Sequence, residues 1–244
     1  MGANEASEAT RGSAASRRLL LLLSFAAGLA VANLYYGQPL AAAIGESLDA
    51  PAAAIGTALT ATQIGYALGM ILLVPLGDAR ERRSLVVTTL ACSVPALLLL
   101  AMSRSVPALI ASSLLVGASS SVVQMIVPYA VDLAPLEQRG RVVGTIMSGL
   151  FAGILLSRTV SGALGAAFGW RAVYVIAAGA MAVLAVVLRL RMPARHPAVR
   201  LAYREVLRSL VVVVRTQPVL RRRRWWARWG SRASASSGRC CRTT

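Results

Sequence analysis

The chain has 244 residues, of which 57% are hydrophobic and only 14% are charged, and its mean hydropathy is +0.65. A soluble globular chain is nearer half apolar and a quarter charged, so this composition excludes an ordinary soluble enzyme. The formal net charge is +17, and all 26 basic residues are arginines. The three cysteines and one histidine have no spacing that suits a zinc site or a disulfide framework, so we expect neither a metal nor a cofactor.

The N-terminal residues 1–16 are small and polar, and we expect them to be disordered. Arg17 and Arg18 then open a long apolar run. Together with Ala30-Val31-Ala32, this run also resembles a secretory signal and its cleavage site. Because further apolar runs follow, we favour an uncleaved first membrane helix.

Six apolar runs follow one another along the chain, and each is near the ~20 residues that a helix needs to cross a hydrocarbon core of ~30 Å. A segment inside lipid must satisfy its own backbone hydrogen bonds, so all six are predicted to be helices. Their approximate ranges are 18–42, 54–77, 85–102, 106–130, 143–166 and 171–189. The sequence therefore predicts an all-α membrane protein with a six-helix transmembrane domain over residues 17–190.

The arginines in the loops are unevenly distributed between the two sides of the predicted bundle. The side opposite to the N-terminus has only Arg104 and Arg171. The N-terminal side has the other arginines outside the spans: Arg11, Arg17, Arg18, Arg80, Arg82, Arg83, Arg139, Arg141 and the fifteen from Arg189 onward. Loops rich in arginine stay in the cytoplasm, which predicts an inner-membrane protein with both termini cytoplasmic. This rule explains most of the positive charge, so nucleic acid is not expected as a partner.

Small residues recur with the same spacing in the two halves of the bundle. The matched features are Gly65 and Gly69 with Gly149 and Gly153, and Pro39 before Gly56 with Pro128 before Gly144. A unit of three spans that is repeated once must be inverted in the membrane, which is typical of transporters. The alternative is that small residues recur in any bundle of membrane helices.

The short loop after the second span carries Asp78, Arg82 and Arg83. Its alternating charges can lock the flanking helices together, or it can be a basic cytoplasmic loop and nothing more. This loop resembles the signature Gly-x-Leu-Ala-Asp-Arg-x-Gly-Arg-Arg of the major facilitator superfamily of transporters, although Ala79 and Glu81 depart from it. The segments ANLYYGQPL, PLEQRGRVVGT and FGWRAVY resemble the same family, nearest to its drug/proton antiporters and sugar efflux permeases. The resemblance covers residues 18–220, which correspond to the N-terminal six helices of a twelve-helix transporter.

The resemblance implies a conformational gate at the cytoplasmic ends of the helices. In this family the acid and arginines of the loop pair with an acid at the inner end of the fourth helix, and Asp132 occupies such a place. The gate residues would be Asp78, Arg82, Arg83 and Asp132, and a purely structural salt bridge is the alternative. The fifth helix resembles the glycine-rich helix of the antiporters at Gly144, Gly153 and Gly162, which with Gly65, Gly69 and Gly149 are expected to allow close helix packing.

Arg158 is the one charge placed clearly inside a predicted span, and Ser157-Arg158 stands where the antiporter pattern has a Gly-Pro pair. An ionisable residue inside the membrane is a functional candidate by default, and Arg158 could bind an anionic group, bias a proton, or extend outward to the lipid surface. Asn33, Tyr36, Gln63 and Gln124 are further candidates for lining a pocket, or they form hydrogen bonds between helices. No acid lies deep in a span, so coupling to a proton would use Arg158 or a part of the transporter outside this chain.

After the sixth span, residues 191–224 resemble the basic loop that joins the two halves of the family. Residues 225–244 do not resemble a seventh span. Read one nucleotide earlier with GC-rich codons, however, they encode an apolar stretch, so we hypothesise a shifted reading frame near Arg221–Arg224 and a disordered basic tail. A genuine basic tail remains the alternative.

These observations predict a transporter rather than an enzyme. We expect a small-molecule exporter that works by alternating access, truncated here and inactive alone. Its partners would be a small-molecule substrate, a proton and membrane lipid, with the missing C-terminal half or a second copy completing the pathway. Two alternatives are a half-transporter that is active as a dimer and a membrane interaction protein whose basic tail binds anionic lipid.

Overall fold

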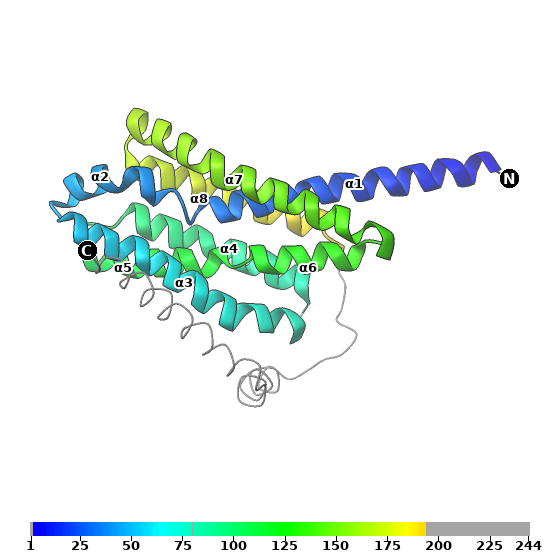
Figure 1. The fold of residues 1–244 in the computed structure, drawn as a ribbon, viewed down its shortest axis with the longest axis horizontal. Coiled ribbons are helices and arrows are strands. Elements are labelled where there is room, and N and C mark those ends of the chain that lie inside the picture. The colour runs from blue at the N-terminus through cyan, green and yellow to red at the C-terminus, as the bar shows by residue number, and fades with distance from the viewer. Residues whose placement is uncertain (1, 80, 194–244) are drawn as a thin grey trace, which may run out of the picture. The chain divides into compact units, whose positions relative to one another are not determined.

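The computed structural model describes residues 2–79 and 81–193, and every regular element in this part of the chain is a helix. Figure 1 shows their arrangement. The helices are α1 (Gly2–Ala32), α2 (Gly37–Leu48), α3 (Ala52–Ala79), α4 (Arg82–Ala101), α5 (Val106–Ser120), α6 (Val123–Leu133), the short 3-10 helix η1 (Leu136–Gln138), α7 (Arg139–Phe168) and α8 (Trp170–Arg191).

Within the described residues, six helical segments are long and apolar enough to cross a membrane. They are Arg17–Leu48, Ala52–Leu73, Arg82–Ala101, Val106–Leu133, Leu136–Phe168 and Trp170–Arg191. The prediction of six membrane helices is confirmed, and most observed edges lie within a few residues of the predicted ones. The first and fourth spans each consist of two helices, α1 with α2 and α5 with α6.

The first helix begins much earlier than we expected. The backbone is helical from Gly2, although residues 1–16 were predicted to be disordered. This segment contains no proline, and its alanines, glutamates and arginine are good helix formers that continue directly into the apolar run. In Figure 1 this part of α1 extends beyond the other described helices.

Successive spans run in opposite directions between two ends of the bundle. Contacts at one end bring together the start of α4, the end of α6 and the end of α8, and we call it the Arg82 end. Contacts at the other end bring together the end of α2, the α4–α5 loop and the start of α8, and we call it the Trp170 end. The first and third spans begin at the Arg82 end and the second begins at the Trp170 end, whereas the fourth and sixth begin at the Trp170 end and the fifth begins at the Arg82 end. The second unit of three spans is therefore inverted relative to the first.

The helix pairing obeys the same symmetry. The second span, α3, packs along α5 of the fourth span, and the fifth span, α7, packs along α1 of the first. Both pairs approach through glycine: a Cβ added at Gly65 would overlap the backbone of Leu114, and one added at Gly149 would overlap the backbone of Ser24. Partner glycines that the sequence analysis missed lie on the facing helices, Gly28 before Pro39 and Gly117 before Pro128, 11 positions in each case. Small residues at these crossings allow the backbones to touch, which stabilises membrane helix pairs by dispersion.

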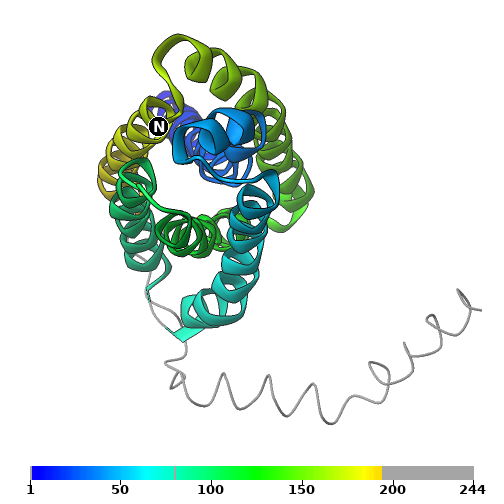
Figure 2. The ribbon, with the colours of Figure 1, turned by 90° about the vertical axis from the view of Figure 1, so that its left-hand side faces the viewer.

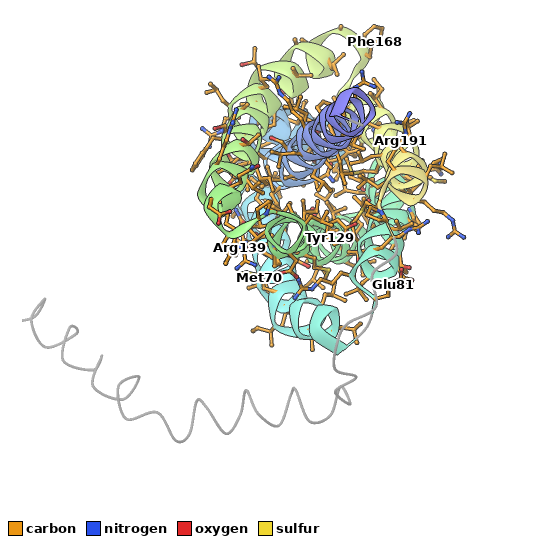
Figure 3. All side chains as sticks on the ribbon, turned by 90° about the vertical axis from the view of Figure 1, so that its right-hand side faces the viewer. Met70, Glu81, Tyr129, Arg139, Phe168 and Arg191 are labelled. Atoms are coloured by element: carbon orange, nitrogen blue, oxygen red, sulfur yellow. The ribbon has the colours of Figure 1, made fainter. Side chains whose placement is uncertain are left out.

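The two remaining spans pack together on one side of the bundle. Helix α4 lies along α8, and the views from both ends show these two opposite to α3 and α7 (Figures 2 and 3). Leu90, Leu97, Met181 and Leu188 are completely buried, and side chains fill the space between the helices (Figure 3). By contrast, only 17% of the apolar part of α7 is buried, against 61% for the first span.

Candidate functional site

The Arg82 end carries an ion pair between the ends of two helices. The Arg82 guanidinium donates a hydrogen bond to the Asp132 carboxylate, which joins the start of α4 to the last turn of α6. The two side chains are 27% and 58% exposed, and an exposed pair of this kind stabilises a fold by only about 0.2–1 kcal/mol. The structure thus brings together two of the four residues expected to form a gate.

The other two gate residues differ from each other. Arg83 donates through Nη2 to the carbonyl oxygen of Arg189, at 2.6 Å, so it joins the start of α4 to the end of α8. The last carbonyls of a helix lack partners within the helix, and a cation there is favourable. The backbone of Asp78 lies in the last turn of α3, but its side chain is outside the described residues.

The first and fourth spans are both interrupted, and they are equivalent members of the inverted repeat. In the first span, residues 33–36 form turns between α1 and α2, and Pro39 cannot donate the hydrogen bond that would continue the helix. In the fourth span, Ser121 and Val122 form the turn between α5 and α6. The hydroxyls of Ser119, Ser120 and Ser121 there all donate to carbonyls three or four residues earlier, a pattern that bends helices.

Asn33 lies at the first interruption and faces a small cavity. Its side chain is 4% exposed, and its Oδ1 has no hydrogen-bond partner in the described residues. The cavity, of about 20 Å³, is lined by residues of five helices, including Thr62, Ser113 and Tyr174. This volume holds about one water molecule and no organic substrate. Tyr36 is also buried nearby, so Asn33 and Tyr36 belong to the core of this half rather than to an open surface.

Arg158 lies on the exposed side of α7, next to the same interruption. Its guanidinium carbon is 5.9 Å from the centre of the Tyr35 ring, which is a cation–π contact. Tyr35 is half-buried in the turn between α1 and α2. Sequence reasoning singled out Asn33 and Tyr36 but missed Tyr35, which lies between them and is the residue that contacts Arg158.

Gln124 makes the corresponding contact at the second interruption. Its amide Nε2 donates to the hydroxyl of Tyr66 at 2.8 Å, which joins the first turn of α6 to α3. Tyr66 was also missed by sequence reasoning. Gln63 lies one turn away on α3 and is exposed, so the structure does not bring Gln63 and Gln124 together.

The glycines expected at helix crossings fall into two groups. Gly65, Gly69, Gly149 and Gly153 each lie against the backbone of a neighbouring helix. Gly144 has open space where a Cβ would be. A Cβ added at Gly162 would make only an ordinary contact with the ring of Pro39. Gly162 therefore groups with Gly144 rather than with the four glycines at close helix crossings.

Arg171 organises the Trp170 end, and no expectation had been placed on it. Its guanidinium donates to the Ser47 hydroxyl at 3.0 Å and to the Ser103 carbonyl at 3.3 Å, and it lies 4.3 Å from the centre of the Trp170 ring. One side chain thus links α8 to the end of α2 and to the α4–α5 loop. The Trp-Arg pair inside the segment FGWRAVY was the available signal.

The fold and these contacts define one class of protein: a bundle of six membrane helices built as an inverted repeat, with both equivalent spans broken near polar side chains, is the architecture of a membrane transporter. The model of the Major Facilitator Superfamily matches residues 20–238. The chain belongs to the major facilitator superfamily.

Relatives and solved structures agree with this assignment. The chain is 42% identical over 208 residues to the putative uncharacterized transporter YgaY of Escherichia coli K12, covering 85% of this chain and 53% of the relative. It is 33% identical over 171 residues to the probable transporter SCO4007 of Streptomyces coelicolor, covering 70% and 40%. The crystal structure of the human organic anion transporter MFSD10 superposes with a TM-score of 0.62 at 17% identity, covering 84% of this chain and 54% of that one, which shows a shared fold. The chain spans about half the length of the relatives that it matches.

Proposed function

We propose that this chain forms one half of a secondary-active transporter that exports a small molecule by alternating access. The observation that carries the proposal is the one-sided burial of the bundle in a chain of this family. Helix α7 leaves most of its surface exposed, and α3 lies on the same side (Figure 2). A second six-helix unit packed on this side would complete a pathway between the two units.

The second unit is either a C-terminal half of the same transporter or a second copy of this chain. Support comes from the relatives, of which the chain spans about half. Residues 194–224 of the basic linking segment and the shifted frame hypothesised near Arg221–Arg224 lie outside the described residues. They decide whether the second unit is a C-terminal half or a second copy, but the proposal requires a second unit in either case.

We further propose that the Arg82–Asp132 pair acts as a gate, with Arg83 and Asp78 completing it. The pair joins helices from both repeats, so it breaks whenever the repeats separate at this end. Because the ion pair is exposed, little free energy is needed to break it, since such pairs stabilise a fold by about 1 kcal/mol at most. The arginine-rich Arg82 end would face the cytoplasm of an inner-membrane protein.

Coupling to a proton would need a carboxylate that titrates inside the membrane. The acids with described side chains in the described spans lie at the ends of the bundle: Glu46 at the Trp170 end, and Asp132 and Glu137 at the Arg82 end. A titrating carboxylate would therefore come from the second unit.

The proposal is tested by measuring mass and export together. The chain is expressed in cells that lack their own efflux pumps, retention of a panel of dyes is recorded, and the mass of the purified complex is measured in lipid nanodiscs. We expect export only where the mass shows two six-helix units, and loss of that export in Arg82→Glu but not in Arg104→Ala at the opposite end. Export by a single copy, or paired copies that export nothing and bind anionic vesicles instead, would contradict the proposal.

A further inference from the structure

We infer that the substrate of this transporter is an organic carboxylate, which Arg158 binds through its guanidinium while the Tyr35 ring supports the bound group. This inference rests on the proposed function and names the chemistry of its substrate. Four observations carry it: the unused donors of Arg158, its position, the surrounding charge, and the ring beside it.

The guanidinium of Arg158 has hydrogen-bonding capacity to spare. It makes a cation–π contact with Tyr35, and no hydrogen bond or ion pair joins it to another described residue. An arginine has five N–H donors in a planar fork, and a carboxylate matches that fork with two parallel hydrogen bonds. Arg82, Arg83 and Arg171 all use their forks on protein oxygens, so Arg158 differs from them.

The position of Arg158 argues against a simple anchor at the lipid surface. It lies ten residues before Phe168 at the end of α7, which is about 15 Å along a helix. An arginine that extends toward the lipid surface lies along its own helix, away from the membrane centre. Here the guanidinium instead lies across to the turn between α1 and α2, over the ring of Tyr35.

No acid with a described side chain balances the charge of Arg158. The described acids of the helical bundle lie at its two ends: Glu46 and Asp49 close to the Trp170 end, and Glu81, Asp132 and Glu137 close to the Arg82 end. A charge inside a membrane span is unfavourable unless it is paired or hydrated. A bound carboxylate would supply the missing partner, whereas a neutral or cationic substrate would not.

Tyr35 explains why the bound group would be organic rather than a small inorganic anion. Its half-buried ring, held by the turns at 33–36, presents an apolar face beside the guanidinium. The carboxylate of a substrate would take the fork, and its carbon skeleton would lie against the ring.

The test follows chemical modification of Arg158 in the full chain, purified in nanodiscs of zwitterionic lipid. Phenylglyoxal modifies accessible arginines, and mass spectrometry reports its rate at each site. The probes are benzoate and benzamide, which share a shape and differ in charge. A probe at about ten times its dissociation constant slows modification about tenfold, since only free sites react. We expect benzoate to slow Arg158 in this way, benzamide to have no effect, and Arg104 to react equally in all samples.

A variant of the ring makes the assignment more specific. Tyr35→Phe keeps the apolar face and should keep the protection by benzoate, whereas Tyr35→Leu should weaken it. Equal rates at Arg158 with both probes would overturn the inference, as would an Arg158 that does not react at all and so faces no water. Protection by anionic lipid in the nanodisc but not by benzoate would show a lipid anchor and would overturn it too.

The outcomes also separate this inference from the proposed function. Export without protection of Arg158 would remove the carboxylate assignment and leave the transporter intact. Protection by benzoate in a chain that exports nothing, paired or single, would remove the transport function and leave the anion site.

Discussion

Gly65 shows how much of this bundle depends on single residues. It lies where α3 crosses α5, and even a methyl group there would overlap the Leu114 backbone. Gly144 on α7 has the same absence of a side chain and the same expected role, but it faces open space. The difference comes from the helix opposite to each glycine rather than from the glycine itself.

We predict that Gly65→Ala destabilises the bundle by roughly 1–3 kcal/mol, the usual cost of extra volume in a packed contact. Gly144→Ala is the matched control and should change the stability by less than about 1 kcal/mol, in the stabilising direction, because alanine favours helix. Unfolding of both variants in mixed micelles measures the difference. Equal losses in the two variants would mean that α3 and α5 do not touch at Gly65.

At the scale of the element, the two interrupted spans are the most distinctive feature. At each interruption, a side chain contacts the helix that packs along the interrupted span. Tyr35 contacts Arg158 of α7, and Gln124 contacts Tyr66 of α3. The first contact is electrostatic and leaves donors unused, whereas the second is a closed hydrogen bond. The proposed ligand site is therefore at the first interruption, and we expect the second to fix the register of α6 against α3.

The hydrogen bond between Tyr66 and Gln124 is testable by a double-mutant cycle with Tyr66→Phe and Gln124→Leu. Hydrogen bonds between membrane helices contribute about 0.6 kcal/mol on average and ~1.7 kcal/mol at most, so we expect a coupling energy in that range. Replacing Gln124→Leu by Gln38→Leu, which changes an exposed side chain on α2, should reduce the coupling to zero. A cycle with no coupling for the original pair would show that the two side chains do not meet in the membrane.

The six spans and their inverted order could be predicted because they depend on local properties. Hydropathy marks each span, and the recurrence of Gly65 and Gly69 with Gly149 and Gly153 marks the repeat. The partners of Arg158 and Gln124 could not be predicted in this way. These contacts depend on α7 lying along α1 and on where the chain turns at 33–36. Hydropathy does not reveal a turn inside a continuous apolar run.

At the scale of the whole molecule, the two sides of the bundle present different surfaces. Between Val175 and Val186, the exposed residues of α8 are apolar or glycine, as expected for a surface in lipid. The exposed sides of α3 and α7 include Gln63, Ser148 and Arg158. We take the first side to face lipid and the second to face a water-filled pathway and a second six-helix unit.

The accessibility of single cysteines tests this claim most directly. Cys92 is an exposed native thiol on α4, about 15 Å along the helix from either end, and it reports on the lipid side once Cys240 and Cys241 are replaced by serine. Gln63→Cys and Ser148→Cys, each made in a chain that also carries Cys92→Ser, report on α3 and α7. In lipid, a maleimide that cannot cross membranes should label the cysteines at positions 63 and 148 and leave Cys92 unmodified. Labelling of Cys92 with none at the other two positions would contradict the account, because the pathway would then lie on the opposite side of the bundle.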